Sequence, residues 1–218
     1  MSEKRPSSQA VIGAVIDALI ERHGADDHAD EVARARREFE RKRGRVYEDQ
    51  ELWETWTQAF LEWYVVERVP PGGARPLAAG DLEREGDPRR AAALRAWLTS
   101  HRGLMEIVAL ADGRVEMVDI LAGSAFSVAE KRRLHGVAVG DLAEVRLIGF
   151  EDDVFFGRTF CYHDGSAKAA ILQRAEESLG AGGDRLDVLD ACAAVRLRSE
   201  SYRHVEPAKL YARAPTST

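Results

Sequence analysis

Hydrophobic residues recur along the chain at two different spacings, which divide it into three stretches. In residues 1–100 they lie three and four positions apart, as on one face of an α-helix, whereas residues 101–164 follow the two-residue period of β-strands. The helical spacing returns in residues 165–218. This pattern predicts an α+β fold with an N-terminal unit of about four helices, a central, strongly curved antiparallel sheet of about five strands, and C-terminal helices packed on the sheet. We expect the three stretches to form one composite domain.

The N-terminal stretch gives clear helix boundaries. A first helix around residues 11–20 has its apolar side chains on one half of a helical wheel, and Gly24 ends it. A second helix is expected over residues 27–43. A fourth begins at Asp87 and Pro88, which are favourable residues for the cap and the first turn.

The third helix runs through residues 49–64 and carries three of the four tryptophans on its apolar face. Its polar face is expected to be marked by Glu51, Glu54, Gln58 and Glu62. The proline and glycine residues of 69–86 predict a linker or an exposed loop between the third and fourth helices.

The central stretch predicts two hairpins. Residues 104–110 and 115–121 are suited to strands and flank an Asp-Gly pair, the strongest short signal for a hairpin turn. Residues 125–130 form a further strand, and residues 142–150 and 154–162 form the second hairpin around an acidic turn at 151–153. Since the first strand is apolar on both faces, the sheet is expected to be curved or covered by helices, and to be the scaffold on which they pack.

The last stretch predicts a helix over residues 167–179, a glycine-rich break, and a second helix from Asp184 to about residue 202. Leu210 and Tyr211 in the tail are candidates to dock on the rest of the molecule.

Composition narrows the class of protein. The formal net charge of -6 disfavours nonspecific binding to nucleic-acid backbones. Two cysteines form no disulfide framework, so a cytoplasmic, reducing location is expected, and the abundance of alanine, arginine and glycine is typical of a GC-rich bacterial genome. The apolar run at 11–20 is too short to cross a bilayer and is interrupted by Asp17, so no membrane partner is expected.

The second helix carries an arginine face, formed by Arg34, Arg37, Arg41 and Arg45, opposite a narrow apolar stripe. One interpretation is a solvated face with ion pairs between successive turns. The other is a docking patch for a protein with an acidic surface, since a planar guanidinium group suits carboxylate contacts. These four arginines are the predicted partner-binding residues.

Cys161 and His163 are the nearest approach to a reactive pair. Two residues apart on a strand, they point to the same face and can share a metal ion or form a nucleophile and its base. Two ligands are too few for a structural zinc site, and the other candidate ligands, Cys192, His101, His135 and His204, follow no ligand spacing. We therefore expect structural or surface roles for the pair, with no catalytic residue, no metal and no cofactor assigned.

Single-stranded nucleic acid is a further candidate ligand, because a small curved sheet with exposed aromatic residues can bind bases by stacking. The sheet contains Phe126, Phe150, Phe155, Phe156 and Phe160, but the basic residues among them are mainly Arg114, Arg146 and Arg158. The sparse basic residues and the acidic net charge make this ligand unfavoured.

A set of short segments resembles a β-rich domain of uncharacterised bacterial proteins. They are residues 104–108, 118–123 and 140–142 with Val128, Arg146 and Leu147, and residues 60–64 are similar to the helical lead-in of that group. Some members carry a cysteine-rich, zinc-binding SEC-C tail, which this chain lacks, so the resemblance implies no zinc role here.

Together these patterns favour a non-enzymatic cytoplasmic adaptor or regulator that acts through protein–protein interaction, with bacterial signalling, motility or polarity as candidate settings. A metal-dependent or Cys/His enzyme centred on Cys161 and His163 is the first alternative. Binding of single-stranded nucleic acid is the second.

Overall fold

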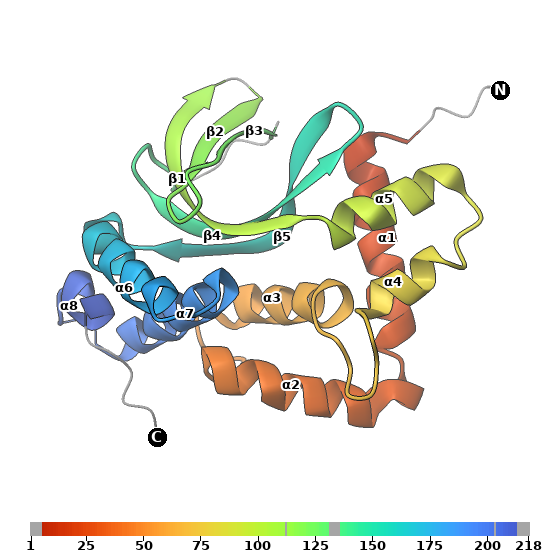
Figure 1. The fold of residues 1–218 in the computed structure, drawn as a ribbon, viewed down its shortest axis with the longest axis horizontal. Helices are drawn as coiled ribbons and strands as arrows, with labels where there is room; N and C mark the ends of the chain where they lie inside the picture. Colours follow the sequence, from red (N-terminus) through yellow and green to blue (C-terminus); the bar gives the residue numbers. More distant parts are fainter. Residues whose placement is uncertain (1–5, 112, 131–135, 203, 213–218) are drawn as a thin grey trace.

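The computed structural model describes residues 6–111, 113–130, 136–202 and 204–212. Over this part of the chain there are eight α-helices and one five-stranded antiparallel sheet, which confirms the predicted α+β class (Figure 1). The helices are α1 (Ser8–His23), α2 (Ala29–Arg43), α3 (Trp53–Val66), α4 (Leu77–Leu82), α5 (Pro88–Leu98), α6 (Lys168–Gly180), α7 (Arg185–Ser201) and α8 (Pro207–Ala212). The strands are β1 (His101–Ala111), β2 (Arg114–Asp119), β3 (Ala125–Ala129), β4 (Leu142–Phe150) and β5 (Asp153–His163).

The predicted helix boundaries follow the capping residues. Gly24 closes α1 by donating its backbone N–H to Ile20 O, and the Asp87 carboxylate accepts the first two free N–H groups of α5, which begins at Pro88. Short 3-10 turns at Asp26–His28 and Gly165–Ala167 precede α2 and α6. The apolar faces of α1, α2, α3 and α5 meet in one core cluster.

The prediction that residues 69–86 form a loop is wrong at its centre, where α4 lies. Ala78 on α4 is fully buried, and the Asp81 carboxylate accepts hydrogen bonds from Arg22, His23 and Arg84. Pro76 directly precedes this helix, which is six residues long and has Gly80 within it. Tertiary contacts therefore stabilise a helix too short to be detected from its own periodicity.

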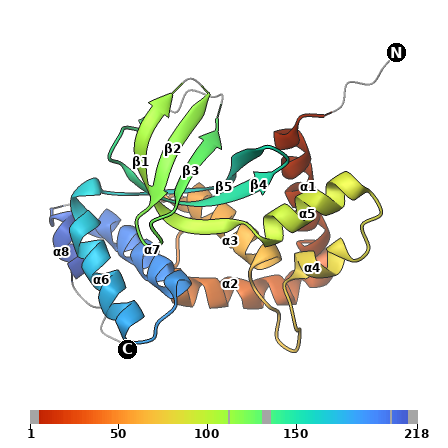
Figure 2. The same ribbon diagram turned by 45° about the horizontal axis from the view of Figure 1, so that its top comes forward.

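The sheet has the strand order β3-β2-β1-β4-β5 and both predicted hairpins, β1–β2 and β4–β5. Asp112 of the first turn lies outside the described residues. The sheet curls until β3 approaches β5, and Figure 2 shows β1, β2 and β3 rising away from the helices. Its concave side holds a core of its own, which includes Met105, Ile107, Met117 and Val145.

The other side of the sheet is covered by helices, as expected for a scaffold. Figure 1 shows α3 and α7 beneath β4 and β5, with α1, α4 and α5 at one end and α6 and α8 at the other. Tyr211 on α8 is buried in the cluster that joins α6 and α7 to the sheet, so the tail docks. Residues 214–218, expected to fray, lie outside the described residues. None of the described helices has the length and apolar content needed to cross a bilayer.

Candidate functional site

A buried ion network lies where α2, α3, β1, β4 and α7 meet. Six of its seven side chains are buried, and the seventh, that of Glu67, is partly buried. The guanidinium groups come from Arg43, Arg102 and Arg146, and the carboxylates come from Glu62, Glu67, Glu144 and Asp190.

Glu144 on β4 lies near the centre of the network. Its carboxylate accepts two hydrogen bonds from Arg43, at 3.0 and 2.5 Å, and one from Arg102 Nε at 2.9 Å. Burial acts to raise the pKa of Glu144, but Arg43 and Arg102 outweigh burial and lower this pKa from 4.5 to about 2. The carboxylate is therefore ionised at neutral pH.

Arg102 and Arg146 extend the network to α3. Arg102 donates to Glu67 at 2.9 Å and to Asp190, and Arg146 Nη2 donates to the other oxygen of Glu67 at 2.7 Å. Burial acts to raise the pKa of Glu67, but the two guanidinium groups hold it below its ordinary value. This geometry links the N-terminal helices, the sheet and α7 through charge-assisted hydrogen bonds.

Glu62 on α3 corrects the sequence interpretation. Predicted to mark a polar face exposed to water, it is buried, and it accepts hydrogen bonds from Thr159 Oγ1 at 2.9 Å and from the backbone N–H of Arg158. The signal was present in the sequence, because Ala59 and Val66 lie one turn before and one turn after it on the same face.

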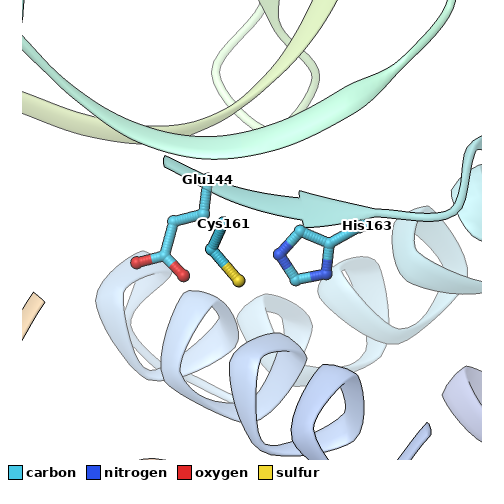
Figure 3. A group of neighbouring side chains, drawn as sticks. All are labelled: Glu144, Cys161 and His163. Atoms are coloured by element: carbon cyan, nitrogen blue, oxygen red, sulfur yellow. The ribbon is translucent and has the colours of Figure 1, made fainter. Parts of the chain in front are cut away.

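Next to this network, Cys161 and His163 point to the same face of β5, as predicted. The β4–β5 register places Glu144 opposite Cys161, so a carboxylate joins the thiol and the imidazole. One potential ligand atom of each residue lies within 4.8 Å of the other two, and all three residues are buried. Figure 3 shows the three side chains converging on one space.

His163 has two different nitrogen environments. Nδ1 lies 2.7 Å from Tyr211 Oη, whereas the buried Nε2 has no hydrogen-bond partner among the described residues. In Figure 3 one ring nitrogen faces Cys161. Burial lowers the pKa of His163 to about 4, so the ring is neutral at pH 7.

A nucleophilic role for Cys161 is disfavoured by these surroundings. Burial raises the pKa of the Cys161 thiol to about 12, with a contribution from Glu144. A cysteine nucleophile reacts as the thiolate, usually beside an imidazolium group, and here both partners are neutral at pH 7.

The four predicted partner-binding arginines are all exposed on α2 or directly after it. Arg34 forms an ion pair with Glu31 at 3.0 Å, and Arg45 stacks over the ring of Tyr47. Within the described residues, Arg37 and Arg41 make no ion pair.

Glu38 lies among these arginines, and its charge interacts with those of Arg34 and Arg41, but its hydrogen bonds go to another residue. Its carboxylate accepts hydrogen bonds from the buried Arg68, at 2.6 and 3.0 Å, and Arg68 also binds Glu31 at 2.7 Å. The hydrogen bonds from Arg68 hold the pKa of Glu38 below its ordinary value. A solvated face balanced by ion pairs along the helix therefore describes Arg34 but not Arg37 or Arg41.

A groove of about 470 Å³ runs between α2 and α7, beside the arginine face. Its lining includes basic side chains (Arg41, Lys42, Arg174 and Arg198), acidic side chains (Glu40, Asp187 and Asp190) and three apolar side chains of α7 (Ala191, Ala194 and Leu197). We refer to it as the α2–α7 groove. Lys42 is paired with Asp187 at 3.3 Å, while Arg198 is exposed and, over the described part of the chain, makes no ion pair.

The five phenylalanines considered for nucleic-acid binding differ in exposure. Phe150 and Phe155 are buried with the helices, and Phe126, Phe156 and Phe160 are partly buried against the concave core of the sheet. Arg146 belongs to the buried ion network, and Arg114 and Arg158 bind Asp153 and Asp17.

Comparisons of this chain with protein-family models, with curated proteins and with solved structures gave no match. The resemblance to β-rich bacterial domains therefore stays a prediction.

Proposed function

We propose that this protein is a non-enzymatic adaptor or regulator that binds an acidic segment of another protein, using the arginine face and the α2–α7 groove. The observation that carries the proposal is the pair Arg37 and Arg41, which are exposed and make no ion pair in the described part of a chain with a net charge of -6. Unpaired guanidinium groups on an acidic protein attract an acidic ligand and orient it.

The groove supplies the apolar part of such an interface. Leu197 and two alanines on α7 line the groove, and so do Arg41 and Arg198. An amphipathic helix with acidic residues beside its apolar face fits both features. The interface would then combine apolar burial at the centre with charge pairs at the edge.

Two single charge reversals, Arg41→Glu and Arg95→Glu, test the proposal. Arg95 on α5 is an exposed arginine that makes no ion pair over the described residues, and it lies on a different part of the surface. Both variants change the net charge by the same amount, so they differ only in position.

The wild-type protein and both variants are immobilised and exposed to extract from the native host, and bound proteins are quantified by mass spectrometry. Affinity for each recovered partner is then measured with purified protein at two salt concentrations. We expect Arg41→Glu to weaken a direct, salt-sensitive partner about tenfold or more, because like charges across an interface cost several kcal/mol. Arg95→Glu should bind as the wild type does. Equal affinity of both variants for every direct partner would exclude this surface.

A further inference from the structure

The groups around Cys161 can do more than fill the core. Glu144, Cys161 and His163 supply one carboxylate oxygen, one thiol sulfur and one imidazole nitrogen within 4.8 Å of one another. If the three atoms formed an equilateral triangle of that side, its centre would lie about 2.8 Å from each, compared with zinc–ligand bonds of about 2.0–2.3 Å. A small inward movement of the side chains therefore suffices for coordination.

We propose that Glu144, Cys161 and His163 form a binding site for one divalent transition-metal ion of the zinc type. Oxygen, sulfur and nitrogen are the three donor types found at zinc sites, and three protein ligands leave a fourth position for water or another ligand. None of its three residues lines the α2–α7 groove, and the site does not depend on the proposed adaptor function.

His163 provides an independent observation that points to a ligand. The residue is 3% exposed, and its Nε2 atom has no hydrogen-bond partner within the described residues. A buried polar nitrogen without a partner costs free energy, and a metal bond would satisfy it. Coordination by Nε2 requires the tautomer in which Nδ1 donates its proton to Tyr211 Oη, 2.7 Å away. A hydrogen bond of this kind commonly orients a metal-binding histidine.

Glu144 retains a free acceptor position despite its two arginine partners. Oε1 accepts from Arg43 and Arg102, but Oε2 accepts only the bond from Arg43 Nη2. A carboxylate offers about four lone-pair positions, so one remains on Oε2 for a metal ion. Figure 3 shows one carboxylate oxygen of Glu144 on the side that faces the Cys161 sulfur.

The charge balance of the surroundings also accommodates a cation. In the described structure the buried ion network has four carboxylates and three guanidinium groups, with the half-exposed Lys42 3.6 Å from Asp190 at its edge. When a divalent ion binds, the thiol loses its proton to solvent and the sulfur forms the metal bond, so the site gains one net positive charge. That positive charge offsets the one carboxylate by which the buried ion network exceeds its guanidinium groups.

A route to the site exists on the side of α8. A cleft of about 690 Å³ is lined by Tyr162, His163, Arg196 and Tyr211. It brings solvent to the histidine that would bind the metal, and an entry path of this kind is required for loading a folded protein.

The test uses the full chain, stripped of metal, with the Cys161→Ser variant and the matched control Cys192→Ser. Cys192 on α7 is the second buried cysteine and lies outside the three-residue cluster. Zn²⁺ affinity is measured by competition with a chromophoric chelator, with the metal added both to folded protein and during refolding. Co²⁺ then replaces Zn²⁺, because a cobalt–thiolate bond gives a charge-transfer absorption in the near ultraviolet.

We expect the wild type and Cys192→Ser to bind one equivalent of Zn²⁺ and to give the cobalt–thiolate band. Cys161→Ser should lose the band and bind Zn²⁺ at least about 100-fold more weakly, and Tyr211→Phe should bind it about 10–100-fold more weakly. Absence of stoichiometric binding by the wild type, or unchanged binding by Cys161→Ser, would overturn the proposal.

If Cys161→Ser does not fold, zinc X-ray absorption on the wild type decides the matter without it. One sulfur ligand with nitrogen and oxygen ligands supports the site. A shell of nitrogen and oxygen alone overturns it.

Discussion

Arg102 contacts three of the four carboxylates of the buried ion network. It contacts Glu67, Glu144 and Asp190 from β1, and it is only 6% exposed. Removing a guanidinium group from water costs several kcal/mol, and the attraction of the three carboxylates must offset that cost. Each of the three carboxylates also has a second cationic partner, so Arg102 supplies part of the compensation of each.

Replacing Arg102 by methionine should therefore destabilise the protein by about 3–5 kcal/mol, because the substitution removes one cationic partner from each of three carboxylates, two of them buried. Urea denaturation at pH 7 measures the change. Arg75→Met is the control, since Arg75 lies in an exposed pair with Glu83 and should leave the denaturation midpoint unchanged. An Arg102→Met variant as stable as the wild type would show that the network contributes no net stability.

The lowered pKa of Glu67 predicts how the stability of the protein changes in acid. Its pKa in the folded protein lies below the ordinary value of 4.5, despite burial, because Arg102 and Arg146 stabilise the carboxylate. Its contribution to stability is therefore complete above pH 4.5 and is lost as the pH falls through the lower, folded-state pKa.

In Glu67→Gln we expect a flatter loss of stability below pH 4.5 than in the wild type. The free energy of unfolding, measured in urea from pH 7 to pH 3, provides the comparison. The same slope in both proteins would mean that this carboxylate is not stabilised by folding.

Single residues also mark where sequence interpretation succeeds. Exposure of Arg37 and Arg41 follows from helical period alone. Arg43 could have been recognised as buried, because it lies one turn after Phe39 on the apolar stripe of α2. The burial of Glu144 could not have been recognised. Glu144 and Arg146 alternate with apolar residues, as on a strand with one face toward solvent, and only the helices packed over β4 bury that face.

At the scale of elements, the caps and turns were the reliable signals. Asp87 with Pro88 located α5 and the Asp-Gly pair located the first hairpin, because each signal depends only on residues next to it in the chain. Helix α4 and the position of Tyr211 depend instead on partners far away in the chain. The periodicity of a short segment does not depend on contacts with distant residues, so neither feature could be predicted from it.

Gly44, which ends α2, gives a prediction at this scale. Its φ of 88° is unfavourable for other residues, and a Cβ atom there would lie 2.7 Å from Leu197 Cδ2 on α7. Gly44→Ala should cost about 1–3 kcal/mol through backbone strain and the disturbed contact between α2 and α7.

Gly13 in α1 is the matched control, because nothing lies within 4 Å of an added Cβ and its φ is helical. Gly13→Ala should raise stability by up to about 1 kcal/mol, since alanine favours the helix. Thermal unfolding of the two variants measures effects of opposite sign. Equal shifts in the melting temperature would contradict the assignment of strain to Gly44.

At the scale of the whole molecule, the sheet joins two groups of helices that are far apart in the sequence. The core around α1, α2, α3 and α5 includes Ile148, Phe150 and Phe155 of the sheet, while α6, α7 and α8 share a second core with Leu104 and Leu142. The buried ion network spans the boundary between them. Neither helical group can separate from the sheet without exposing buried charges.

This arrangement predicts one cooperative unfolding transition, and the chain contains natural probes for both halves. All four tryptophans lie at positions 53–97, whereas the two cysteines lie on β5 and α7, and both thiols are buried. Tryptophan fluorescence therefore follows the N-terminal helices, and the reaction of the thiols with a disulfide reagent follows the sheet and α7.

In metal-free protein the two signals should change at the same urea concentration, because loss of either half exposes the network and raises the free energy of the other. Two separated midpoints would show instead that the halves unfold independently and that the network does not couple them.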